Sequence, residues 1–492
     1  MKLIQKYQTD WINTTPVFYN TNTKQISLNM NDVIDWNNFE FDSEGLYNYL
    51  FFGYQVFEQT QVKNVKFLRH SSIITQYQDS NNELKYEIQV LDDPIEEYIG
   101  KKSTSDEVID KLQKHVQAFE QNVCKLQSNK RFLLPLSGGY DSRLIATLIE
   151  DKSRIDAFTF DISLSEKYSF ESKYAQEICR LLEINWQSIY LNQYWNDLYT
   201  RKNFEAFCLE MPSQASYHME MYEKIIQEHG NQYIALSGSV GDWWRSQKVP
   251  LSVPNNFHCF DSLFFNHGIS IPAEYIQVQT DHDIKKTIYD QNIKRLKEDD
   301  LFKIVFARRG RIGLASFIYR TASLYFDTYT PFYDIEIAMS QLNLHTDHVF
   351  NQAWIKDFFS NNKLNVEQKN HKQFAMSNDF GLDIKTVYYS IKKEDLLHPH
   401  YFKGIINPQR VEWINYQLSK AKNIPFPLLS LISRMFFGVD KLASNISLRT
   451  IFGKGFDYTY CRAFKTNDIF KAISEWSVLK PIEIAMIKAH KL

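Results

Sequence analysis

The sequence predicts an α/β protein with a parallel β-sheet at its centre, and two observations lead to this prediction. From Lys130 onward, short apolar segments alternate with amphipathic helical segments, which is the pattern of strands joined by crossover helices. Glycine-rich turns directly follow the first and the fourth apolar segments, and ligands of such sheets bind beyond the carboxyl ends of strands. The predicted strands are RFLLPL (131–136), IDAFTFDI (155–162), WQSIYL (186–191) and YIALSG (233–238).

Composition indicates an ordinary globular chain. The 492 residues are 44% hydrophobic and 23% charged, which excludes a disordered or fibrous protein. A net charge of -2 gives no overall attraction to nucleic acid or to an anionic membrane, so neither is expected as a partner. No run of about 18 apolar residues predicts a membrane span. The segment most similar to such a run, Phe426–Val439, is interrupted by Arg434. It is expected to be a buried helix, with a helix on a membrane surface as the alternative.

The cysteines and the N-terminus favour a cytoplasmic protein. The N-terminal residues lack the apolar segment of a secretory signal. The five cysteines are odd in number, are far apart and form no CxxC pair, so we expect buried reduced thiols and neither disulfides nor a zinc site. They are Cys124, Cys179, Cys208, Cys259 and Cys461.

Four regions are expected along the chain. Residues 1–102 contain short alternating apolar segments between polar turns and predict a small β-rich domain, with one helical stretch at Leu46–Val56. Residues 103–127 predict an amphipathic linker helix that Thr104 or Ser105 caps. Residues 128–375 form the predicted α/β domain, and residues 376–492 a helical C-terminal extension.

The most informative motif is LLPLSGGYDSR, residues 133–143. The N–H groups of Gly138 and Gly139 can close around an anion because glycine has no Cβ, and the predicted helix that follows points its positive end at the same place. Two serine hydroxyls, those of Ser137 and Ser142, add donors. The motif therefore predicts a pyrophosphate-binding loop, although it is neither a Walker A loop nor a GxGxxG turn. An ordinary strand–turn–helix connection is the alternative.

Carboxylates in both turns predict a metal. Asp141 has the wrong charge to attract phosphate, so we expect it to hold a divalent cation that bridges phosphates. The second turn, LSGSVGD (236–242), supplies another carboxylate in Asp242. Two aspartates at neighbouring strand ends could share magnesium ions against a triphosphate and stabilise charge on departing pyrophosphate.

At these residues the chain resembles the synthetase domain of asparagine synthetase and its relatives among the PP-loop ATP pyrophosphatases. SGGYDSR is similar to the family's SGGxDS loop, and LSGSVGD is similar to its SGxGxDE turn. Further segments resemble other parts of the family: PVFY (16–19), LYNYLFFGYQ (46–55), VKNVKFL (62–68), FTFD (158–161), Glu171–Leu182, Arg320–Asp334 and Trp354–Phe374. The resemblance implies a Rossmann-like, adenine nucleotide alpha hydrolase-like fold.

The resemblance also implies an activity and a set of cofactors. ATP and a substrate carboxylate would give an acyl-adenylate and pyrophosphate, and ammonia or an amine would then form an amide, with ATP and Mg²⁺ required. Residues 1–102 would be a truncated, degenerate glutaminase domain without its cysteine nucleophile, since Lys2 follows Met1. Ammonia would then come from solution or from a separate glutaminase. A homodimer is left open.

Site residues follow from the same resemblance, one position at a time. Asp141 and Asp242 would bind magnesium, and Lys372, with Lys369 as the second choice, would stabilise the leaving pyrophosphate. The phosphate contacts would be Ser137, Gly138, Gly139 and Ser142. The adenosine contacts would be Leu136, the backbone of Phe158, Thr159 and Phe160, and Gly238.

Three departures from the family pattern put asparagine synthesis itself in doubt. Ser239 and Trp243 stand where the family has glutamates, and Arg143 replaces a small residue and adds catalytic charge beside the loop. The pair Trp243-Trp244 suggests a reshaped acceptor side, with two core tryptophans as the alternative. An amidotransferase in bacterial surface-polysaccharide synthesis is our first expectation. A cyclase of the β-lactam synthetase or lasso-peptide type and a non-catalytic nucleotide-binding scaffold remain alternatives, and a sulfur transferase acting on RNA is disfavoured.

Weaker clusters complete the survey. The pairs His345/His348 and His398/His400 have no third metal ligand by spacing, so no zinc is expected. The basic cluster Arg308, Arg309 and Arg311 is expected either to meet a substrate carboxylate or phosphate or to be a solvated face.

Overall fold

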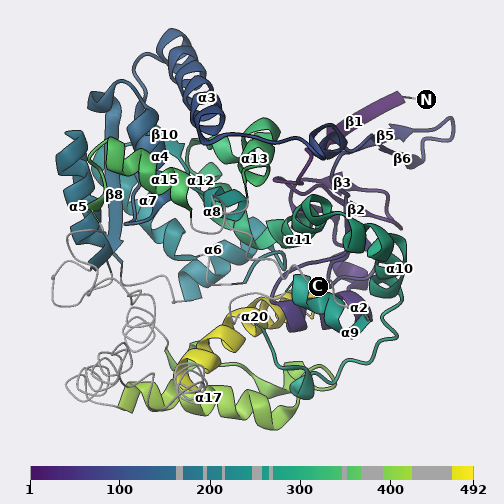
Figure 1. Ribbon diagram of the computed structural model, residues 1–492. Coiled ribbons are helices and arrows are strands. Elements are labelled where there is room, and N and C mark those ends of the chain that lie inside the picture. The colour runs from purple at the N-terminus through teal and green to yellow at the C-terminus, as the bar shows by residue number, and fades with distance from the viewer. Residues whose placement is uncertain are drawn as a thin grey trace, which may run out of the picture.

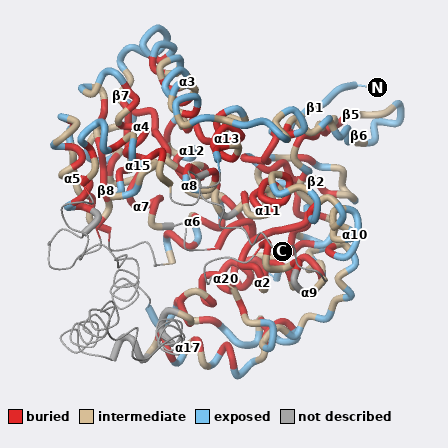
Figure 2. The backbone as a smooth tube through the Cα atoms, in the orientation of Figure 1, coloured by how far each residue is buried: buried red, intermediate tan, exposed pale blue. Residues whose placement is uncertain are grey.

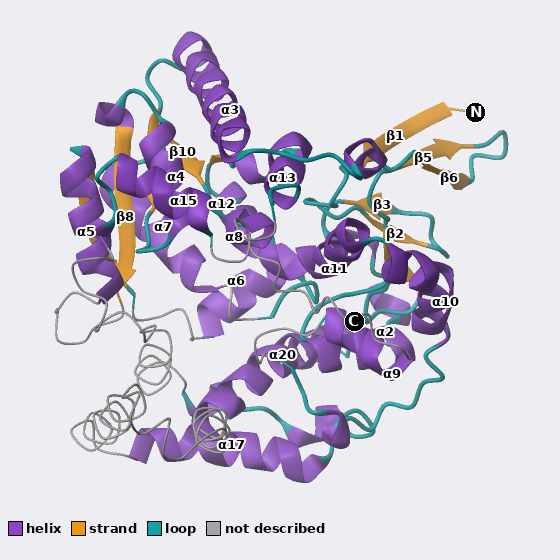
Figure 3. Ribbon diagram, viewed as in Figure 1, coloured by secondary structure: helices purple, strands orange, loops and turns teal. Residues whose placement is uncertain are grey.

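In the computed structural model, a five-stranded parallel sheet lies among helices at one side of the molecule (Figures 1 and 3). The structure describes residues 2–161, 170–191, 197–212, 216–245, 257–264, 270–345, 352–366, 392–423 and 468–490. The strands of the sheet are β7 (Arg131–Pro135), β8 (Ile155–Asp161), β9 (Asn185–Tyr190), β10 (Tyr233–Leu236) and β11 (Asp327–Tyr329). The first four are the strands that the sequence predicts, and the short strand β11 extends the sheet at one edge.

The strand order places the predicted site at the centre of the sheet. The order is β11-β10-β7-β8-β9, with all neighbours parallel. From β7 the chain builds outward through β8 and β9, and then returns to the other side of β7 to form β10 and β11. The order therefore reverses between β7 and β10, which is the position where Rossmann-like sheets bind their ligands. The predicted α/β, Rossmann-like fold is confirmed.

Strand β7 is buried on both faces, which explains its continuous apolar sequence. Phe132 and Leu134 belong to one hydrophobic core and Leu133 to the other, because successive side chains of a strand point to opposite faces. The backbone of β7 is correspondingly coloured as buried in Figure 2. The first core takes residues from α3 (Ser105–Leu126), α4 (Tyr140–Leu148), α5 (Phe170–Leu182) and α13 (Ile335–Leu342). The second takes residues from α6 (Asp197–Phe207), α7 (Ser216–His229), α17 (Pro408–Asn423) and α20 (Asp468–Ala489).

The predicted linker helix is α3, and its cap is the predicted one. The Thr104 side chain accepts a hydrogen bond from the Glu107 N–H, and the Glu107 carboxylate accepts one from the Thr104 N–H. This capping box satisfies two N–H groups that the first turn leaves without helical partners. The buried face of the helix is Val108, Leu112, Val116 and Val123.

The N-terminal region forms two small antiparallel sheets and contains the helices α1 and α2, in agreement with the predicted β-rich segment. The sheets have the orders β1-β5-β6 and β3-β2-β4. The elements are β1 (Lys2–Gln8), β2 (Phe18–Asn20), β3 (Ile26–Ser27), α1 (Met30–Val33), α2 (Ser43–Phe52), β4 (Val65–Phe67), β5 (Ser72–Gln78) and β6 (Leu84–Val90). Helix α2 ends before the predicted Val56, because Gly53 takes a left-handed conformation at φ +78° and caps it.

Helices dominate the remaining described residues, as the sequence predicts. They are α8 (Gly241–Arg245), α9 (Phe257–Phe260), α10 (Asp283–Glu298), α11 (Asp300–Ala315), α12 (Phe317–Ser323) and α15 (Ala353–Asn361), together with α17 and α20. None of the helices within the described ranges combines the length and the apolar character that crossing a membrane requires. The apolar stretch Phe426–Val439 lies outside the described residues.

Candidate active site

The base of the glycine-rich loop is fixed to strand β8. Leu136 donates its N–H to the Phe158 carbonyl at 2.8 Å, and Thr159 Oγ1 donates to the Leu136 carbonyl at 2.6 Å. Trp186 Nε1 in turn donates to Thr159 Oγ1 at 3.0 Å. The Thr159 hydroxyl therefore holds the base of the loop. Of the predicted adenosine contacts, Leu136 directly follows β7, and Phe158 and Thr159 lie beside it within β8.

Helix α4 begins directly after the loop and presents its positive end there. Gly139 is the N-cap residue and supplies no side-chain acceptor, so the first turn carries no side-chain cap. Ser137 and Gly139 are exposed, and the Gly139 N–H donates to Ser137 Oγ at 3.2 Å. The only acid in the first turn of α4 is Asp141. N–H groups at a helix start favour an anion at this place.

The two glycine-rich turns are pressed together. A Cβ added at Gly238 would lie 2.8 Å from the Ser142 nitrogen, and one added at Gly241 would lie 2.3 Å from Asp141 Oδ1. Such contacts do not occur between real atoms, so only glycine permits the turn after β10 to approach the start of α4 this closely. The sequence motifs, about 100 residues apart, thus meet at the point where the strand order reverses.

The second turn holds a strained backbone. Val240 has φ +60°, a left-handed conformation that is unfavourable for a β-branched residue. The turn is closed on both sides of it, since the Gly241 N–H donates to the Gly238 carbonyl at 3.3 Å and the Trp243 N–H to the Val240 carbonyl at 3.1 Å. Strain of this kind costs about 1–3 kcal/mol and is concentrated at functional sites.

The residues around the loop fit a phosphate group and a cation. Ser142 Oγ is buried and has no hydrogen-bond partner among the described residues, so its hydroxyl can donate to a bound phosphate. Gly138 packs against Tyr174, where a Cβ would lie 3.3 Å from the tyrosine Cβ. Asp141 is partly exposed with Oδ1 buried against Gly241, and Asp242 is exposed in the first turn of α8. Carboxylate oxygens are the ligands that Mg²⁺ prefers.

Arg143 is fully buried and braces the loop from behind. Its guanidinium donates to the Gly138 carbonyl at 2.7 Å and to the Leu364 carbonyl at 3.1 Å. The same group lies over the rings of Tyr140 and Phe359, at 5.3 and 5.0 Å from their centroids. These contacts give Arg143 a positioning role, and its predicted catalytic role stays a prediction.

The two tryptophans after the second turn have different surroundings. Trp244 is fully buried, donates from Nε1 to the Phe332 carbonyl at 2.9 Å, and lies 5.5 Å from the Trp11 ring. Trp243 is only partly buried, with the Arg308 guanidinium 5.2 Å from its ring centroid. The interpretation as a core tryptophan is therefore confirmed for Trp244. Trp243 packs against the same core while partly exposed, and its contact with an acceptor stays a prediction.

The basic cluster is neither a solvated face nor, at Arg309, a free cation. Arg309 is paired with Asp93 through two hydrogen bonds of 2.6 and 2.8 Å, and Arg311 donates to the Leu263 carbonyl at 2.7 Å. Burial lowers the pKa of Arg308 to about 10, with Arg311 adding to the shift and Asp242 opposing it. The expectation of a solvated face is wrong, because α11 packs between the N-terminal region and α8.

The structure describes some of the other residues that the sequence singled out, and others lie outside the described ranges. Asp334 caps α13 by accepting from the Glu336 and Ile337 N–H groups. Of the cysteines, Cys179 and Cys208 are buried as expected, whereas Cys124 is exposed on α3. No group of three metal-ligating side chains occurs within the part of the chain that the structure describes. The following lie outside the described residues: Lys369, Lys372, His348 and Cys461, and the side chains of Glu171 and Cys259.

Sequence reasoning missed the residues that shape the site from behind. Neither the Arg143–Leu364 contact nor the approach of Gly241 to Asp141 follows from local spacing, since each joins residues about 100 or more positions apart. The second glycine of SGSVGD was the available signal, because a glycine at a strand end often marks a close approach of two backbones.

Comparison with known proteins agrees with this geometry. Residues 115–243, which include both turns, match the asparagine synthase family. Comparison with curated proteins gives no match. Among solved structures, the NH3-dependent NAD synthetase from Campylobacter jejuni subsp. jejuni NCTC 11168, in complex with the nitrate ion, is 14% identical; the alignment covers 44% of this chain and 96% of that one, with a TM-score of 0.22. Residues 115–243, about a quarter of the chain, are therefore similar to the asparagine synthase family.

Proposed function

We propose that this protein is an ATP-dependent carbon–nitrogen ligase that activates a substrate carboxylate as an acyl-adenylate and transfers the acyl group to ammonia or an amine. The observation that carries the proposal is the contact between the two glycine-rich turns, which brings Asp141 and Ser142 against Gly238 and Gly241 beside the start of α4. The domain for this chemistry would span residues 128–375, between the linker helix at 103–127 and the C-terminal extension at 376–492.

The proposed reaction has two balanced steps. A carboxylate oxygen of the substrate attacks the α-phosphorus of ATP, and the bond from that phosphorus to the bridging oxygen breaks, so that pyrophosphate leaves with the electron pair. The amine nitrogen then attacks the acyl carbon, the bond from carbon to the phosphate oxygen breaks, and AMP leaves while the nitrogen loses a proton. Binding both reactants in one place and neutralising phosphate charge supply most of the rate enhancement in such reactions.

The proposed roles come from the family resemblance, and the placement of the described residues supports those around the two turns. The N–H groups of Gly138 and Gly139 and the hydroxyls of Ser137 and Ser142 hold the β- and γ-phosphates at the positive end of α4. Leu136, Gly238 and the backbone at 158–160 contact the adenosine part. Mg²⁺, held by Asp141 and Asp242, would supply charge neutralisation on the phosphates. Lys372 is proposed for the leaving pyrophosphate.

Arg143 is proposed as a positioning residue for this loop. Because it binds the Gly138 carbonyl, it fixes the peptide plane that separates Gly138 from Gly139 and orients the Gly139 N–H. A buried guanidinium with two carbonyl acceptors has little freedom to move toward a substrate.

The acceptor side differs from the family pattern. Ser239 Oγ donates to the Ala315 carbonyl at 2.8 Å, so the side chain in place of the first family glutamate is already engaged. Trp243 stands in place of the second, and the Arg308 guanidinium lies 5.2 Å from its ring centroid. An amine that arrives with its own binding group suits this surface better than a base-activated ammonia. The surface-polysaccharide setting and the cytoplasmic location stay predictions from the sequence.

Product analysis tests the proposal. The purified protein is mixed with MgATP and a panel of carboxylates and amines, and pyrophosphate, phosphate, AMP and ADP are quantified. We expect pyrophosphate and AMP in equal amounts. Asp141→Asn and Asp242→Asn should each lower pyrophosphate release by about 100-fold or more, since each removes a charge that acts on the phosphates.

The matched control is Asp110→Asn. This variant removes an exposed carboxylate near the N-terminal end of α3, whereas the loop follows the other end of the helix through β7. It should leave the rate unchanged. Formation of ADP and phosphate would contradict the proposal. ATP binding without turnover by any acceptor would instead favour a nucleotide-binding scaffold.

A further inference from the structure

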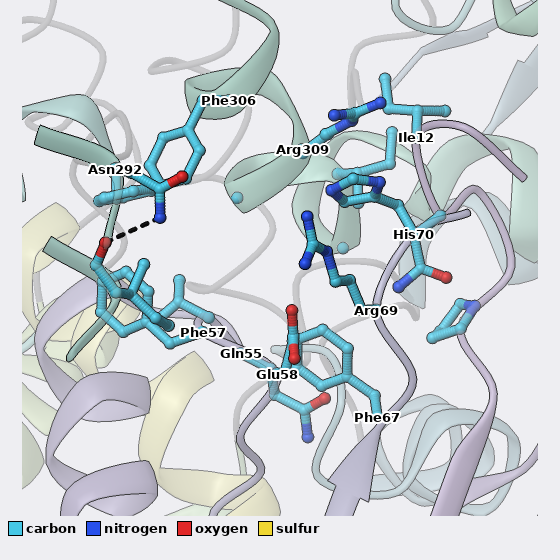
Figure 4. Close-up of a pocket in the computed structure, with 18 of the residues that line it drawn as sticks. Ile12, Gln55, Phe57, Glu58, Phe67, Arg69, His70, Asn292, Phe306 and Arg309 are labelled. Atoms are coloured by element: carbon cyan, nitrogen blue, oxygen red, sulfur yellow. Dashed lines mark hydrogen bonds between the residues drawn. The ribbon is translucent and has the colours of Figure 1, made fainter. Parts of the chain in front are cut away.

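A second cavity lies away from the glycine-rich turns, between the N-terminal region and helices α10 and α11 (Figure 4). Its volume is about 350 Å³, within the range of sites that hold small molecules. None of the described residues that line it belongs to the turns at 136–142 or 237–242. Its chemistry is therefore separate from that of the candidate nucleotide site.

The walls of this cavity are mainly apolar. Apolar side chains that line it include Ile12, Phe57, Phe67, Phe302 and Phe306. In Figure 4, Phe306 and Phe57 lie across the cavity from Arg69 and His70. An apolar group of a ligand would thus find an aromatic wall on one side and charged groups on the other.

Two charged side chains that line the cavity, Glu58 and Arg69, can bind a ligand. Among the described residues, neither the Glu58 carboxylate nor the Arg69 guanidinium makes a hydrogen bond or an ion pair shorter than 4.0 Å, and both side chains are exposed. In Figure 4 the Glu58 carboxylate lies next to the Arg69 side chain. Partial desolvation raises the pKa of Glu58, and the positive charges of Arg69 and Lys66 oppose that rise. The neighbouring Arg309 is different, since Asp93 already pairs with it.

The backbone at Glu58, beside the cavity, has an unfavourable conformation. Phe57 and Glu58 both have φ +60°, two consecutive left-handed residues that are not glycine. Each such residue costs about 1–3 kcal/mol, and residues of this kind cluster at binding sites. The surrounding structure holds them through hydrogen bonds from the Gln59 N–H to the Val56 carbonyl, at 3.1 Å, and from the Phe67 N–H to the Glu58 carbonyl, at 3.4 Å.

We propose that this cavity binds an α-amino acid with an apolar side chain. Its carboxylate would pair with Arg69, its ammonium group with Glu58, and its side chain would pack on the wall formed by Phe57 and Phe306. An α-amino acid carries opposite charges on one carbon, which matches two neighbouring side chains of opposite charge. Charge-assisted hydrogen bonds to both would satisfy two polar groups that the protein leaves without partners. The inference does not rest on the proposed ligase activity.

Calorimetric titration of the full chain without nucleotide tests the proposal. The probes are L-leucine, L-methionine, L-phenylalanine and L-tryptophan, each up to millimolar concentration. At least one is expected to bind. Two analogues of phenylalanine, phenethylamine without the carboxylate and 3-phenylpropionate without the ammonium group, should each bind about 10-fold or more weakly, because each leaves one charged side chain unpaired.

Variants assign the binding to this cavity. Gly313 lines the cavity, and a Cβ added there meets nothing within 4 Å. The larger side chain of Gly313→Leu is therefore expected to take up space that the ligand would occupy. It should abolish binding. Arg69→Gln and Glu58→Gln should each weaken binding about 10-fold or more. The matched controls are Lys63→Gln and Glu40→Gln, which alter an exposed ion pair in the same region.

Each result decides the question. Binding that is lost in Gly313→Leu and weakened in both charge variants but not in the controls supports the assignment. No binding of any of the four amino acids overturns it. Equal affinity for 3-phenylpropionate overturns the zwitterion in favour of a simple carboxylate, and undiminished affinity in Gly313→Leu places the ligand elsewhere. Thermal unfolding curves of each variant show that it is folded.

Discussion

At the scale of single residues, the motif serines and glycines could be predicted from the sequence, but their supports could not. SGGYDS identifies its own chemistry because glycine, hydroxyl and carboxylate are needed at fixed spacings around a phosphate. Arg143 was predicted only as added charge. Its burial depends on the Leu364 carbonyl and the Phe359 ring, more than 200 residues along the chain, and no local pattern encodes that contact.

A buried histidine beside the sheet predicts a pH dependence of stability. His218 is buried among the rings of Phe160, Tyr217, Tyr222 and Phe317. Burial lowers its pKa to about 3, against an unfolded value near 6.5. The unfolded chain therefore binds the proton first as pH falls, so the stability that neutral His218 provides is complete above about pH 6.5 and declines below it.

The variant His218→Phe removes this titration. Relative to the variant, we expect the free energy of unfolding of the wild type to fall by about 1.4 kcal/mol per pH unit between pH 6.5 and 5. Chemical denaturation across this range measures it. His400→Phe, at an exposed site, should show no such difference from the wild type. Parallel stability curves for wild type and His218→Phe would contradict the prediction.

At the scale of elements, the helices and strands with a clear apolar pattern could be predicted from the sequence. Strands β7, β8, β9 and β10 follow from apolar segments between helices, and α3 follows from its apolar spacing and its cap. Strand β11 has only three residues, Asp327–Tyr329, with no apolar run, and it exists because the edge of β10 offers it hydrogen-bond partners. For the basic cluster on α11, a solvated face was one of the two predicted alternatives, and the burial of Arg308 and Arg309 excludes it.

Two glycines three residues apart on α11 allow a matched test of its packing. A Cβ at Gly310 would lie 2.3 Å from Phe264 Cε1, and Phe264 is buried, whereas a Cβ at Gly313 meets nothing within 4 Å. Alanine favours a helix by about 1 kcal/mol over glycine, so Gly313→Ala should raise stability by up to that amount. Gly310→Ala should lower it by about 1–3 kcal/mol because of overpacking.

Thermal unfolding of the two alanine variants measures the difference. The substitutions are chemically identical and lie on the same helix, so each serves as the other's control. A melting temperature for Gly310→Ala at or above that of Gly313→Ala would show that the Phe264 ring moves aside, and the packing argument would then fail.

At the scale of the whole molecule, the N-terminal region and the α/β part share their hydrophobic cores. Ile12, Phe52 and Val56 belong to the same core as Phe132 and Leu134 of the central strand. The sequence indicated a β-rich segment followed by a linker helix but could not reveal this shared core, because the contacts join residues up to about 300 positions apart. Arg309 illustrates it, donating from Nε to the Trp11 carbonyl at 2.7 Å while pairing with Asp93.

The Arg309–Asp93 pair therefore predicts how strongly the N-terminal region is joined to α11. Their side chains are 7% and 17% exposed, and removing one partner of such a pair leaves a charge with little access to water. Arg309→Met should cost about 3 kcal/mol, and Asp93→Asn about as much, with the double variant costing less than the sum. Chemical denaturation followed by tryptophan fluorescence measures the free energy of unfolding of the wild type and of the three variants, since Trp11 lies at this junction.

Lys63→Met, which breaks the exposed pair with Glu40, is the control and should cost no more than about 1 kcal/mol. If Arg309→Met costs no more than Lys63→Met, the buried pair does not hold the two parts together, and their shared hydrophobic core alone must do so.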